Sequence, residues 1–385
     1  MRVMYFSTDY GPHDHRFLSA LAKTAHNVHF LRLAMPERQT EDRAVPAEVE
    51  QLAWAGGTHA FHWRDVPKLV RDLRRVIRDA QPDLIHAGPI QTCAFLAILS
   101  GFKPVLTMSW GFDLMQDADR DPWWRWVTRY TLRRSAFFVS DARVTRAKAV
   151  SLGMRADRTA VFPWGVDLQH FSPGESARSK PRRAPRRGAL KRRGATARRA
   201  REEPFLVFCN RSWEPRYGVD VLARAFVQAA RQHRGLSLVL LGAGSQVNSI
   251  RQVLLEGGQM DRVQFGGHLT WEQLPRWYQR ADLFVSPSHV DGSSVSLMEA
   301  LACGTPVLVS DIPANKEWVR DNVNGWLFRD GDVADLAERI LWISNHRSAL
   351  RRISASARKV AEARADWKRN FQVLLRCYEK AVKPS

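Results

Sequence analysis

The residues best suited to chemistry lie between positions 281 and 325, where polar side chains follow apolar strands. The order is a strand over 283–285, the loop Asp291-Gly292-Ser293-Ser294, a helix carrying Glu299, and a second strand over 307–309. This is the order of a parallel βαβ unit, whose ligands sit at the carboxyl ends of the strands. The Ser293-Ser294 backbone opens the helix, where N–H groups and the helix dipole favour an anion. The segment predicts a site for a molecule with phosphate and hydroxyl groups, such as a nucleotide sugar.

Four motifs in this chain follow one another in the order of a known family. The acid-x7-acid pair Asp291 and Glu299 resembles the signature of retaining glycosyltransferases of the GT-B architecture, most closely their family-four group. The stretch 161–171, VFPWGVDLQHF, resembles that family's domain-crossing PNGVD…F segment. Arg211 with 216–220, RYGVD, resembles its R…KG(V)D loop, and 240–244, LLGAG, resembles its GxG strand end. A single match is weak evidence, but four in the family's order are hard to obtain by chance.

The resemblance implies a role for each acid of the signature. Glu299 is expected to accept hydrogen bonds from the ribose hydroxyls of the donor, since a carboxylate offers two acceptor oxygens to a diol. Asp291 is expected to hold sugar hydroxyls and the reacting ring, although the family usually has the longer Glu there. The alternatives are dipole compensation by Glu299 and an Asx cap by Asp291 on the helix over 294–302.

The resemblance also implies a phosphate grip on the loop after the strand over 205–209. The family binds the donor diphosphate there with an Arg and a Lys, which match Arg211 and Arg216, or Tyr217 if the gap is placed differently. A guanidinium binds phosphate oxygens in bidentate fashion and stabilises the charge of a departing diphosphate. Gly242 and Gly244 are assigned to donor binding with Ser293 and Ser294, although a plain turn is an equal alternative for the glycines.

The N-terminal half is predicted to supply the acceptor side and further catalytic groups. His86 ends one strand, and Trp110 and Asp113 follow the next. Many family members have a His where Trp110 stands, so either Trp110 stacks on a sugar face or His86 makes the polar contact. We assign His86 and Asp113 to catalysis and Gly11, His13 and Trp110 to acceptor binding. A structural role for His86 remains an equal alternative.

Composition favours two soluble domains with one unusual insertion. A chain of 385 residues with 45% hydrophobic residues is ordinary for a globular protein, and no apolar run reaches the ~18 residues of a membrane span. The four scattered cysteines suggest buried, reduced thiols and, with no apolar leader at the N-terminus, a cytoplasmic location. Residues 174–203 carry +9 of the chain's net charge of +20 and one large apolar residue, which predicts a disordered segment.

Alternating strands and helices on both sides of the insertion predict an α/β fold of two facing Rossmann-like, doubly wound domains, the GT-B architecture. We expect an N-terminal acceptor domain over 1–165, the basic insertion over 174–203 and a nucleotide-sugar domain over 204–360. A final helix over 361–385 is expected to return to the N-terminal domain, as in GT-B enzymes. The helix over 122–134, PWWRWVTRYTLRR, has an aromatic face beside an arginine stripe. That face either packs on the sheet or lies on an anionic membrane.

The resemblance implies a metal-independent, retaining transfer of a hexosyl group from a nucleotide-diphosphate sugar to an acceptor hydroxyl, without a cofactor. Asp117, Asp119 and Asp121 form an acid-rich run, but it lies away from the predicted donor site. The acceptor is expected to be a sugar or a lipid-linked sugar of bacterial polysaccharide or glycolipid synthesis, and the basic segment to contact anionic membranes. An epimerase or sugar phosphorylase on the same architecture is the alternative. A non-catalytic module binding nucleic acid or membrane ranks below both, and no nucleic acid partner is expected.

Overall fold

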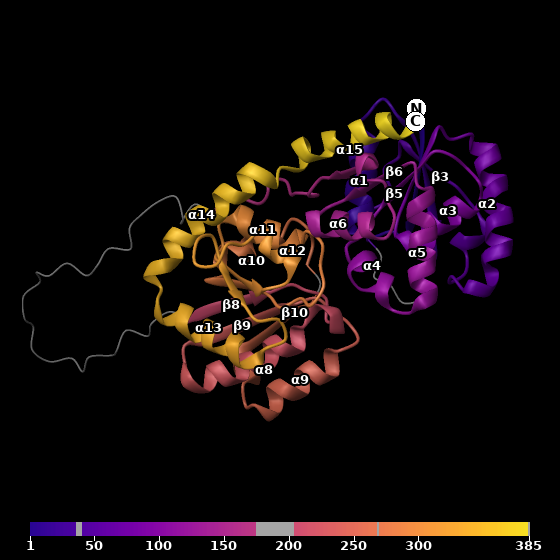
Figure 1. The fold of residues 1–385 in the computed structure, drawn as a ribbon. Coiled ribbons are helices and arrows are strands. Elements are labelled where there is room, and N and C mark those ends of the chain that lie inside the picture. The colour runs from indigo at the N-terminus through magenta and orange to yellow at the C-terminus, as the bar shows by residue number, and fades with distance from the viewer. Residues whose placement is uncertain (36–40, 175–203, 268, 384–385) are drawn as a thin grey trace, which may run out of the picture. The chain divides into compact units, whose positions relative to one another are not determined.

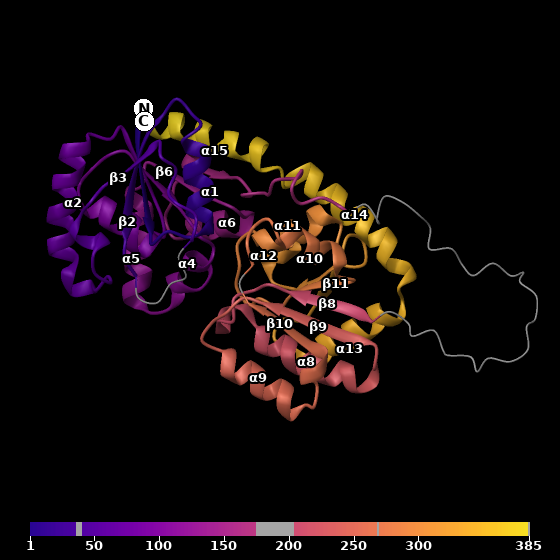
Figure 2. The same cartoon turned by 180° about the vertical axis from the view of Figure 1, so that it is seen from behind.

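The chain forms two compact units, each built on its own parallel sheet (Figures 1 and 2). This computed structural model describes residues 1–35, 41–174, 204–267 and 269–383. The first unit comprises Met1–Trp164, Val290–Ser293 and Lys368–Ser385, and the second comprises Gly165–His289 and Ser294–Trp367. The predicted basic segment lies outside the described residues, apart from Gly174.

The first sheet runs in the order β3-β2-β1-β4-β5-β6-β7, with every neighbouring pair parallel. Its strands are β1 (Arg2–Thr8), β2 (Asn27–Leu33), β3 (Val49–Gln51), β4 (Leu84–Ala87), β5 (Val105–Met108), β6 (Phe137–Ser140) and β7 (Thr159–Val161). The helices between them are α1 (Pro12–Leu21), α2 (Val66–Ala80), α3 (Phe95–Leu99), α4 (Phe112–Met115), α5 (Pro122–Arg134) and α6 (Arg143–Ser151), and α15 (Trp367–Val382) follows at the end of the chain.

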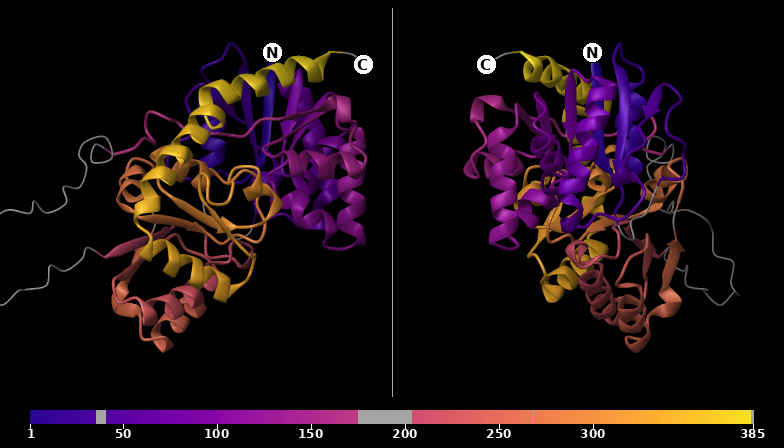
Figure 3. Two further views of the ribbon diagram at one scale, coloured as in Figure 1. Left: turned by 60° about the vertical axis from the view of Figure 1, so that its left-hand side comes forward. Right: turned by 90° about the vertical axis from the view of Figure 1, so that its right-hand side faces the viewer.

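The second sheet runs in the order β10-β9-β8-β11-β12-β13 and is also parallel. Its strands are β8 (Phe205–Cys209), β9 (Leu236–Leu241), β10 (Val263–Gly267), β11 (Leu283–Ser286), β12 (Val307–Ser310) and β13 (Trp326–Phe328). The helices are α8 (Val219–Gln232), α9 (Val247–Glu256), α10 (Leu274–Arg280), α11 (Val295–Cys303), α12 (Pro313–Lys316), α13 (Val333–Asn345) and α14 (Ser348–Arg364). One apolar core lies under α8, α9 and α13, and another lies under α10, α11 and α14, so both faces of the sheet are covered (Figure 3).

Both sheets reverse their strand order once, between β1 and β4 in the first unit and between β8 and β11 in the second. In open parallel sheets, ligands bind at such switch points, beyond the carboxyl ends of the strands. The loops after these four strands are therefore the places to search for function. The central strands of both sheets are buried along almost their whole length, which explains why they read as apolar runs, since both faces of a parallel sheet are covered.

The C-terminal helix belongs to the first unit, as expected for a returning helix. Tyr378 on α15 makes a hydrogen bond of 2.7 Å from its hydroxyl oxygen to Nδ1 of His86 on β4. The four cysteines are buried and form no disulfide within the described part of the chain, which confirms the prediction of buried thiols. Helix α6 begins at Arg143, which leaves Asp141 at the carboxyl end of β6.

Candidate functional site

The loop after β8 presents Arg211, whose guanidinium is held by two serine hydroxyls of the second unit. Its Nη1 donates to Oγ of Ser294 at 2.8 Å and to Oγ of Ser296 at 3.1 Å. Its Cζ lies 4.3 Å from the centroid of the Tyr217 ring, which adds a cation–π contact. Ser294 is also the N-cap of α11, where its hydroxyl accepts from the N–H of Leu297 at 3.4 Å. A fixed guanidinium beside a helix N-terminus suits a phosphate group.

Arg216 lies in the short 3-10 helix η6 (Pro215–Tyr217) of the same connection. Its carbonyl oxygen accepts from the backbone N–H of His289 at 2.9 Å, which ties this loop to the segment after β11. The predicted phosphate contact of its side chain stays a prediction.

Gly242 and Gly244 follow β9 and lie against the backbone of the Arg211 loop. A Cβ at Gly242 would stand 3.0 Å from the carbonyl oxygen of Arg211, and one at Gly244 would stand 2.5 Å from that of Trp213. The backbone N–H of Trp213 donates to the carbonyl of Ala243 at 2.9 Å. The glycines therefore permit a close backbone approach that fixes the Arg211 loop, which supports their turn interpretation.

Glu299 is buried on α11, with 7% of its surface exposed. Its Oε2 accepts from the Tyr278 hydroxyl at 2.7 Å, and the Tyr278 oxygen accepts from the side-chain amide of Asn210 at 2.8 Å. Burial and the neighbouring Glu299 raise the pKa of Tyr278 well above its usual range, so the tyrosine remains a donor. Because the Glu299 carboxylate is buried and oriented by a hydrogen bond, it differs from a solvated charge that only compensates the helix dipole.

The Asp291 loop packs against Asp141 within the first unit. The backbone N–H of Ser293 donates to Oδ2 of Asp141 at 2.5 Å, and the Ser293 hydroxyl donates to the Asp141 carbonyl at 2.7 Å. A Cβ at Gly292 would stand 2.4 Å from the carboxylate oxygens of Asp141, so only glycine fits there. The N–H that was expected to meet an anion at Ser293 is thus directed to a carboxylate. Asp291 accepts from the N–H of Gly292 at 3.0 Å, and the cap of α11 is Ser294 rather than Asp291.

Asp141 is buried in an electronegative setting. Its pKa is raised from 3.8 to about 7, mainly by burial and also by the nearby carboxylates of Asp291 and Asp113, while the Ser293 N–H acts in the opposite direction. Its Oδ1 has no hydrogen-bond partner among the described residues. Protonation of Asp141 relieves the repulsion from these carboxylates, and with a pKa of about 7 the group is partly protonated at neutral pH.

Aromatic rings gather at the switch point of the first unit. The ring of Trp110 lies 5.9 Å from that of His13 and 5.3 Å from that of Trp164, measured between centroids. Gly11 begins α1, and its N–H donates to Oδ2 of the buried Asp14 at 2.8 Å. The structure therefore brings together the three predicted acceptor residues, Gly11, His13 and Trp110, although the N–H of Gly11 is directed inward.

Asp113 organises the loops of the first unit from inside. Its Oδ1 accepts from the Ser109 hydroxyl at 2.6 Å and from the Trp110 N–H at 3.1 Å, and its Oδ2 accepts from the Ile90 N–H at 3.2 Å. Burial raises its pKa from 3.8 to about 6. A fully buried carboxylate with both oxygens engaged is placed to position Trp110, so the structure does not favour the direct catalytic role predicted for Asp113.

His86 is a core residue, which corrects its assignment to catalysis. It is fully buried, and its ring packs edge-on against those of Tyr5 and Tyr378, at 5.1 Å and 5.5 Å. Burial lowers its pKa from 6.5 to about 3, so the ring is neutral. A histidine enclosed by aromatic rings cannot reach a substrate. The sequence offered two alternatives for the sugar contact, stacking by Trp110 or a polar contact by His86, and the structure favours Trp110.

The site residues therefore form two groups, each within one unit. The second unit joins Arg211, on the loop after β8, with Ser294 and Glu299 at the N-cap and in the body of α11. The first unit joins Trp110, after β5, with His13 on α1. Sequence reasoning missed Asp141, Tyr278 and Asn210. The signal for Asp141 and Asn210 was their position one residue beyond a strand, whereas nothing in the sequence distinguished Tyr278 from other core aromatics. Over the described ranges, no group of three or more His, Cys, Asp or Glu side chains is arranged to hold a metal ion.

Comparison with known families accounts for both units. The family model described as glycosyl transferases group 1 matches residues 195–360, and the model described as a glycosyl transferase 4-like domain matches residues 11–165. The chain is 31% identical over 238 residues to a D-inositol 3-phosphate glycosyltransferase of Nocardia farcinica, covering 60% of this chain and 49% of that protein. The match thus spans about half the length of that relative.

Two further proteins resemble the chain over most of its length. A GDP-mannose-dependent alpha-(1-6)-phosphatidylinositol monomannoside mannosyltransferase of Mycobacterium tuberculosis is 26% identical over 313 residues, covering 77% of this chain and 75% of that protein. The crystal structure of Anabaena Alr3699/HepE in complex with UDP superposes with a TM-score of 0.73 at 18% identity, covering 98% of this chain and all of that one. That likeness confirms the predicted GT-B fold.

Proposed function

Because the chain belongs to the group 1 glycosyltransferases of the GT-B, family-four type, we propose that it transfers a hexosyl group from a nucleotide-diphosphate sugar to an acceptor hydroxyl with retention of configuration. The observation that carries the proposal is the Arg211 guanidinium held by Ser294 and Ser296 at the N-terminus of α11, in the same unit as the buried Glu299. The named relatives support a nucleotide donor, since one is GDP-mannose-dependent and one structural neighbour holds UDP.

Each donor residue has a distinct task in this proposal. Glu299, oriented by Tyr278, accepts from the ribose hydroxyls. Arg211 binds the diphosphate and stabilises its growing negative charge as the bond to the sugar breaks, a task for which its fixed position removes reorganisation. Arg216 joins it from the same connection, and Asp291 binds the sugar.

We propose that transfer needs no metal ion or cofactor. Arg211 and the α11 N-terminus stabilise the negative charge of the departing diphosphate. A bound metal ion would otherwise have to neutralise that charge. The acceptor hydroxyl attacks from the same face that the phosphate leaves, and its proton passes to the departing phosphate oxygen. Retention then requires no covalent enzyme intermediate.

We propose a sugar or lipid-linked sugar as acceptor, in bacterial polysaccharide, glycolipid or other glycoconjugate synthesis, on the cytoplasmic side of a membrane. The Mycobacterium tuberculosis relative, named for a phosphatidylinositol monomannoside acceptor, supports a lipid-linked substrate. Across the described residues, no helix has the length and apolar character needed to cross a bilayer. Contact with the membrane would therefore be peripheral if these residues alone made it.

A nucleotide-sugar panel followed by product analysis tests the proposal. A donor at ~100 times its dissociation constant should stabilise the protein by roughly 2.7 kcal/mol, which a thermal shift detects. The stabilising donor is then incubated with sugar acceptors, and mass and the anomeric proton of the product are determined. A new glycoside with the donor's anomeric configuration is expected. An epimerised donor or a sugar phosphate would favour the epimerase or phosphorylase alternative, and absence of any turnover would favour a binding module.

A further inference from the structure

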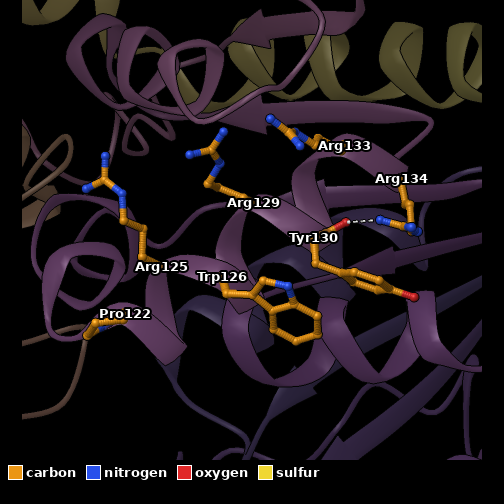
Figure 4. A pocket seen from close by; sticks show the side chains of 7 residues that line it. All are labelled: Pro122, Arg125, Trp126, Arg129, Tyr130, Arg133 and Arg134. Carbon is orange, nitrogen blue, oxygen red and sulfur yellow. Dashed lines mark hydrogen bonds between the residues drawn. The ribbon is translucent and has the colours of Figure 1, made fainter.

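The outward face of α5, in the first unit, carries aromatic and basic side chains together (Figure 4). Its inward face is buried through Val127, Thr128, Thr131 and Leu132, and the helix packs against α3 and the segments 90–94 and 117–119. The outward side chains line a shallow hollow formed by Pro122, Arg125, Trp126, Arg129, Tyr130, Arg133 and Arg134. The helix is thus fixed on one side and presents a defined surface on the other.

Two large apolar rings of this surface face solvent. Trp123 and Trp126 are 50% and 48% exposed, and their rings stack on each other at 5.0 Å between centroids. Tyr130 extends the row, 5.2 Å from Trp126. The sequence left open whether this face packs on the sheet. In the structure Val127 is buried and Tyr130 packs partly against the core, whereas Trp123 and Trp126 remain about half exposed. Exposed neighbouring tryptophans leave apolar area in water, which usually marks a surface with a partner.

A row of cations accompanies these rings. Arg125, Arg129 and Arg133 recur at the four-residue spacing of one helix face, and the guanidinium of Arg134 lies 3.8 Å from the Tyr130 ring centroid. Arg125 pairs with Asp119 at 2.8 Å, whereas the described residues give no ion pair to Arg129, Arg133 or Arg134. Because α5 contains no acidic residue, its outward face is net positive beside an apolar strip.

We propose that this face of α5 binds the surface of an anionic phospholipid bilayer, with Trp123 and Trp126 entering the headgroup boundary and Arg129, Arg133 and Arg134 meeting lipid phosphates. A helix lying in the interface needs this combination of apolar rings and cations along one face. Tryptophan is favoured at that depth because its ring is apolar and its N–H is polar. A nucleic acid would use the arginines, but the two indole rings turn their stacking faces toward each other rather than toward a base.

The proposal does not depend on the proposed glycosyl transfer, because no residue of this face belongs to the candidate site. Binding is measured by co-sedimentation with phosphatidylcholine vesicles, with and without phosphatidylglycerol, at low and high salt. One variant is Arg129→Gln/Arg133→Gln/Arg134→Gln, and the other is Trp123→Ser/Trp126→Ser. Matched controls on the second unit are Arg351→Gln/Arg352→Gln/Lys359→Gln on α14 and Trp342→Ser on α13, since Trp342 is 44% exposed.

Each arginine near an anionic surface contributes about fivefold to partitioning, so the triple variant should bind anionic vesicles roughly 100-fold more weakly at low salt. The effect should fade at high salt, where charges are screened. The tryptophan variant should lose binding at both salt concentrations, and the controls should bind like the wild type. The same comparison within a chain lacking residues 176–201 separates α5 from the basic segment, which lies outside the described residues.

Quenching of tryptophan fluorescence by brominated lipids checks insertion directly. Quenching that disappears in Trp123→Ser/Trp126→Ser supports the proposal, whereas quenching that persists there overturns it. Equal vesicle binding by the α5 variants and their controls also overturns the proposal. So does a result in which the α5 variants lose binding to RNA while their binding to vesicles is unchanged. Transfer to a soluble acceptor should be the same in all of these variants, so its absence from the wild type would count against the proposed function alone.

Discussion

The two sheets reverse strand order at equivalent places, yet the side chains at their carboxyl edges differ in kind. In the second unit, Arg211, two serine hydroxyls and the Glu299 carboxylate form a charged and hydrogen-bonding group. In the first unit, Trp110 and His13 present aromatic rings, and the nearby carboxylates are buried. One edge is suited to neutralise a phosphate and the other to stack on a sugar. The same topology therefore supports different tasks, and the residues beyond the strands decide which.

Arg211→Ala should give the largest effect, because it removes the guanidinium that Ser294 and Ser296 hold at the N-terminus of α11. Loss of one group that stabilises transition-state charge should lower turnover by about 10²–10³-fold at saturating donor. Steady-state kinetics with a soluble acceptor measures this, and His86→Gln is the matched control, since it alters a buried residue of the other unit. Near-normal turnover by Arg211→Ala would show that Arg211 does not stabilise the charge of the departing phosphate, and the assigned difference between the two sheet edges would be wrong.

Glu299→Gln should weaken nucleotide binding by about tenfold and change turnover less. The amide keeps the shape of the side chain but replaces one acceptor oxygen with a donor, so it loses a charged hydrogen bond. Competitive inhibition by the free nucleoside diphosphate measures the effect. Tyr278→Phe, which removes only the hydroxyl that orients Glu299, should show a smaller loss in the same direction. An unchanged inhibition constant in Glu299→Gln would leave Glu299 with a structural role.

Trp110→Ala should raise the KM for the acceptor by about fivefold, or ~1 kcal/mol, because it removes an aromatic stacking surface from the first unit. The inhibition constant for the nucleoside diphosphate should stay at its wild-type value, and Trp110→Phe should retain most of the acceptor affinity. A variant that lost nucleotide affinity instead would place Trp110 on the donor side and remove the distinction between the two edges.

Asp141→Asn should change the pH dependence of stability more than activity. The folded pKa is about 7 and the ordinary value is 3.8, so the folded protein binds this proton more tightly than the unfolded chain. Stability from this group is therefore complete below about pH 4 and is lost as pH rises through 7. Thermal midpoints across pH 4–8 should fall less steeply in Asp141→Asn than in the wild type or in the exposed control Asp261→Asn. Parallel curves would show that Asp141 is ionised in the folded protein.

Much of the fold was predictable, because buried parallel strands are short apolar runs separated by helical patterns. The strand predicted over 205–209 is β8, and the strands predicted over 283–285 and 307–309 are β11 and β12, each one residue longer. The short edge strands β3 and β13 were not predicted, since three residues give no usable periodicity. The final helix predicted over 361–385 is shorter in the structure, where α15 covers Trp367–Val382.

The candidate site was predictable where a motif fixed the backbone. Arg211 and Glu299 were predicted from the resemblance of their motifs to those of the family, and they lie on the loop after β8 and on α11, which follows β11. The error at His86 arose because the local sequence around a strand-end histidine is the same whether its side chain faces solvent or a helix that is distant in the sequence. Its partner Tyr378 is 292 positions away, beyond the reach of local pattern. Asp141 was missed for the same reason, since its contacts with Ser293 span 152 positions.

The most direct test of the account is a calorimetric titration of nucleoside diphosphates, among them UDP and GDP, into the wild type and three variants. If the donor site lies in the second unit, Arg211→Ala should bind at least about tenfold more weakly than the wild type, as expected for a lost charge-assisted hydrogen bond. Trp110→Ala and His86→Gln should keep the wild-type affinity, because both residues belong to the first unit. Equal affinity of Arg211→Ala and the wild type, with weaker binding by Trp110→Ala, would contradict the account.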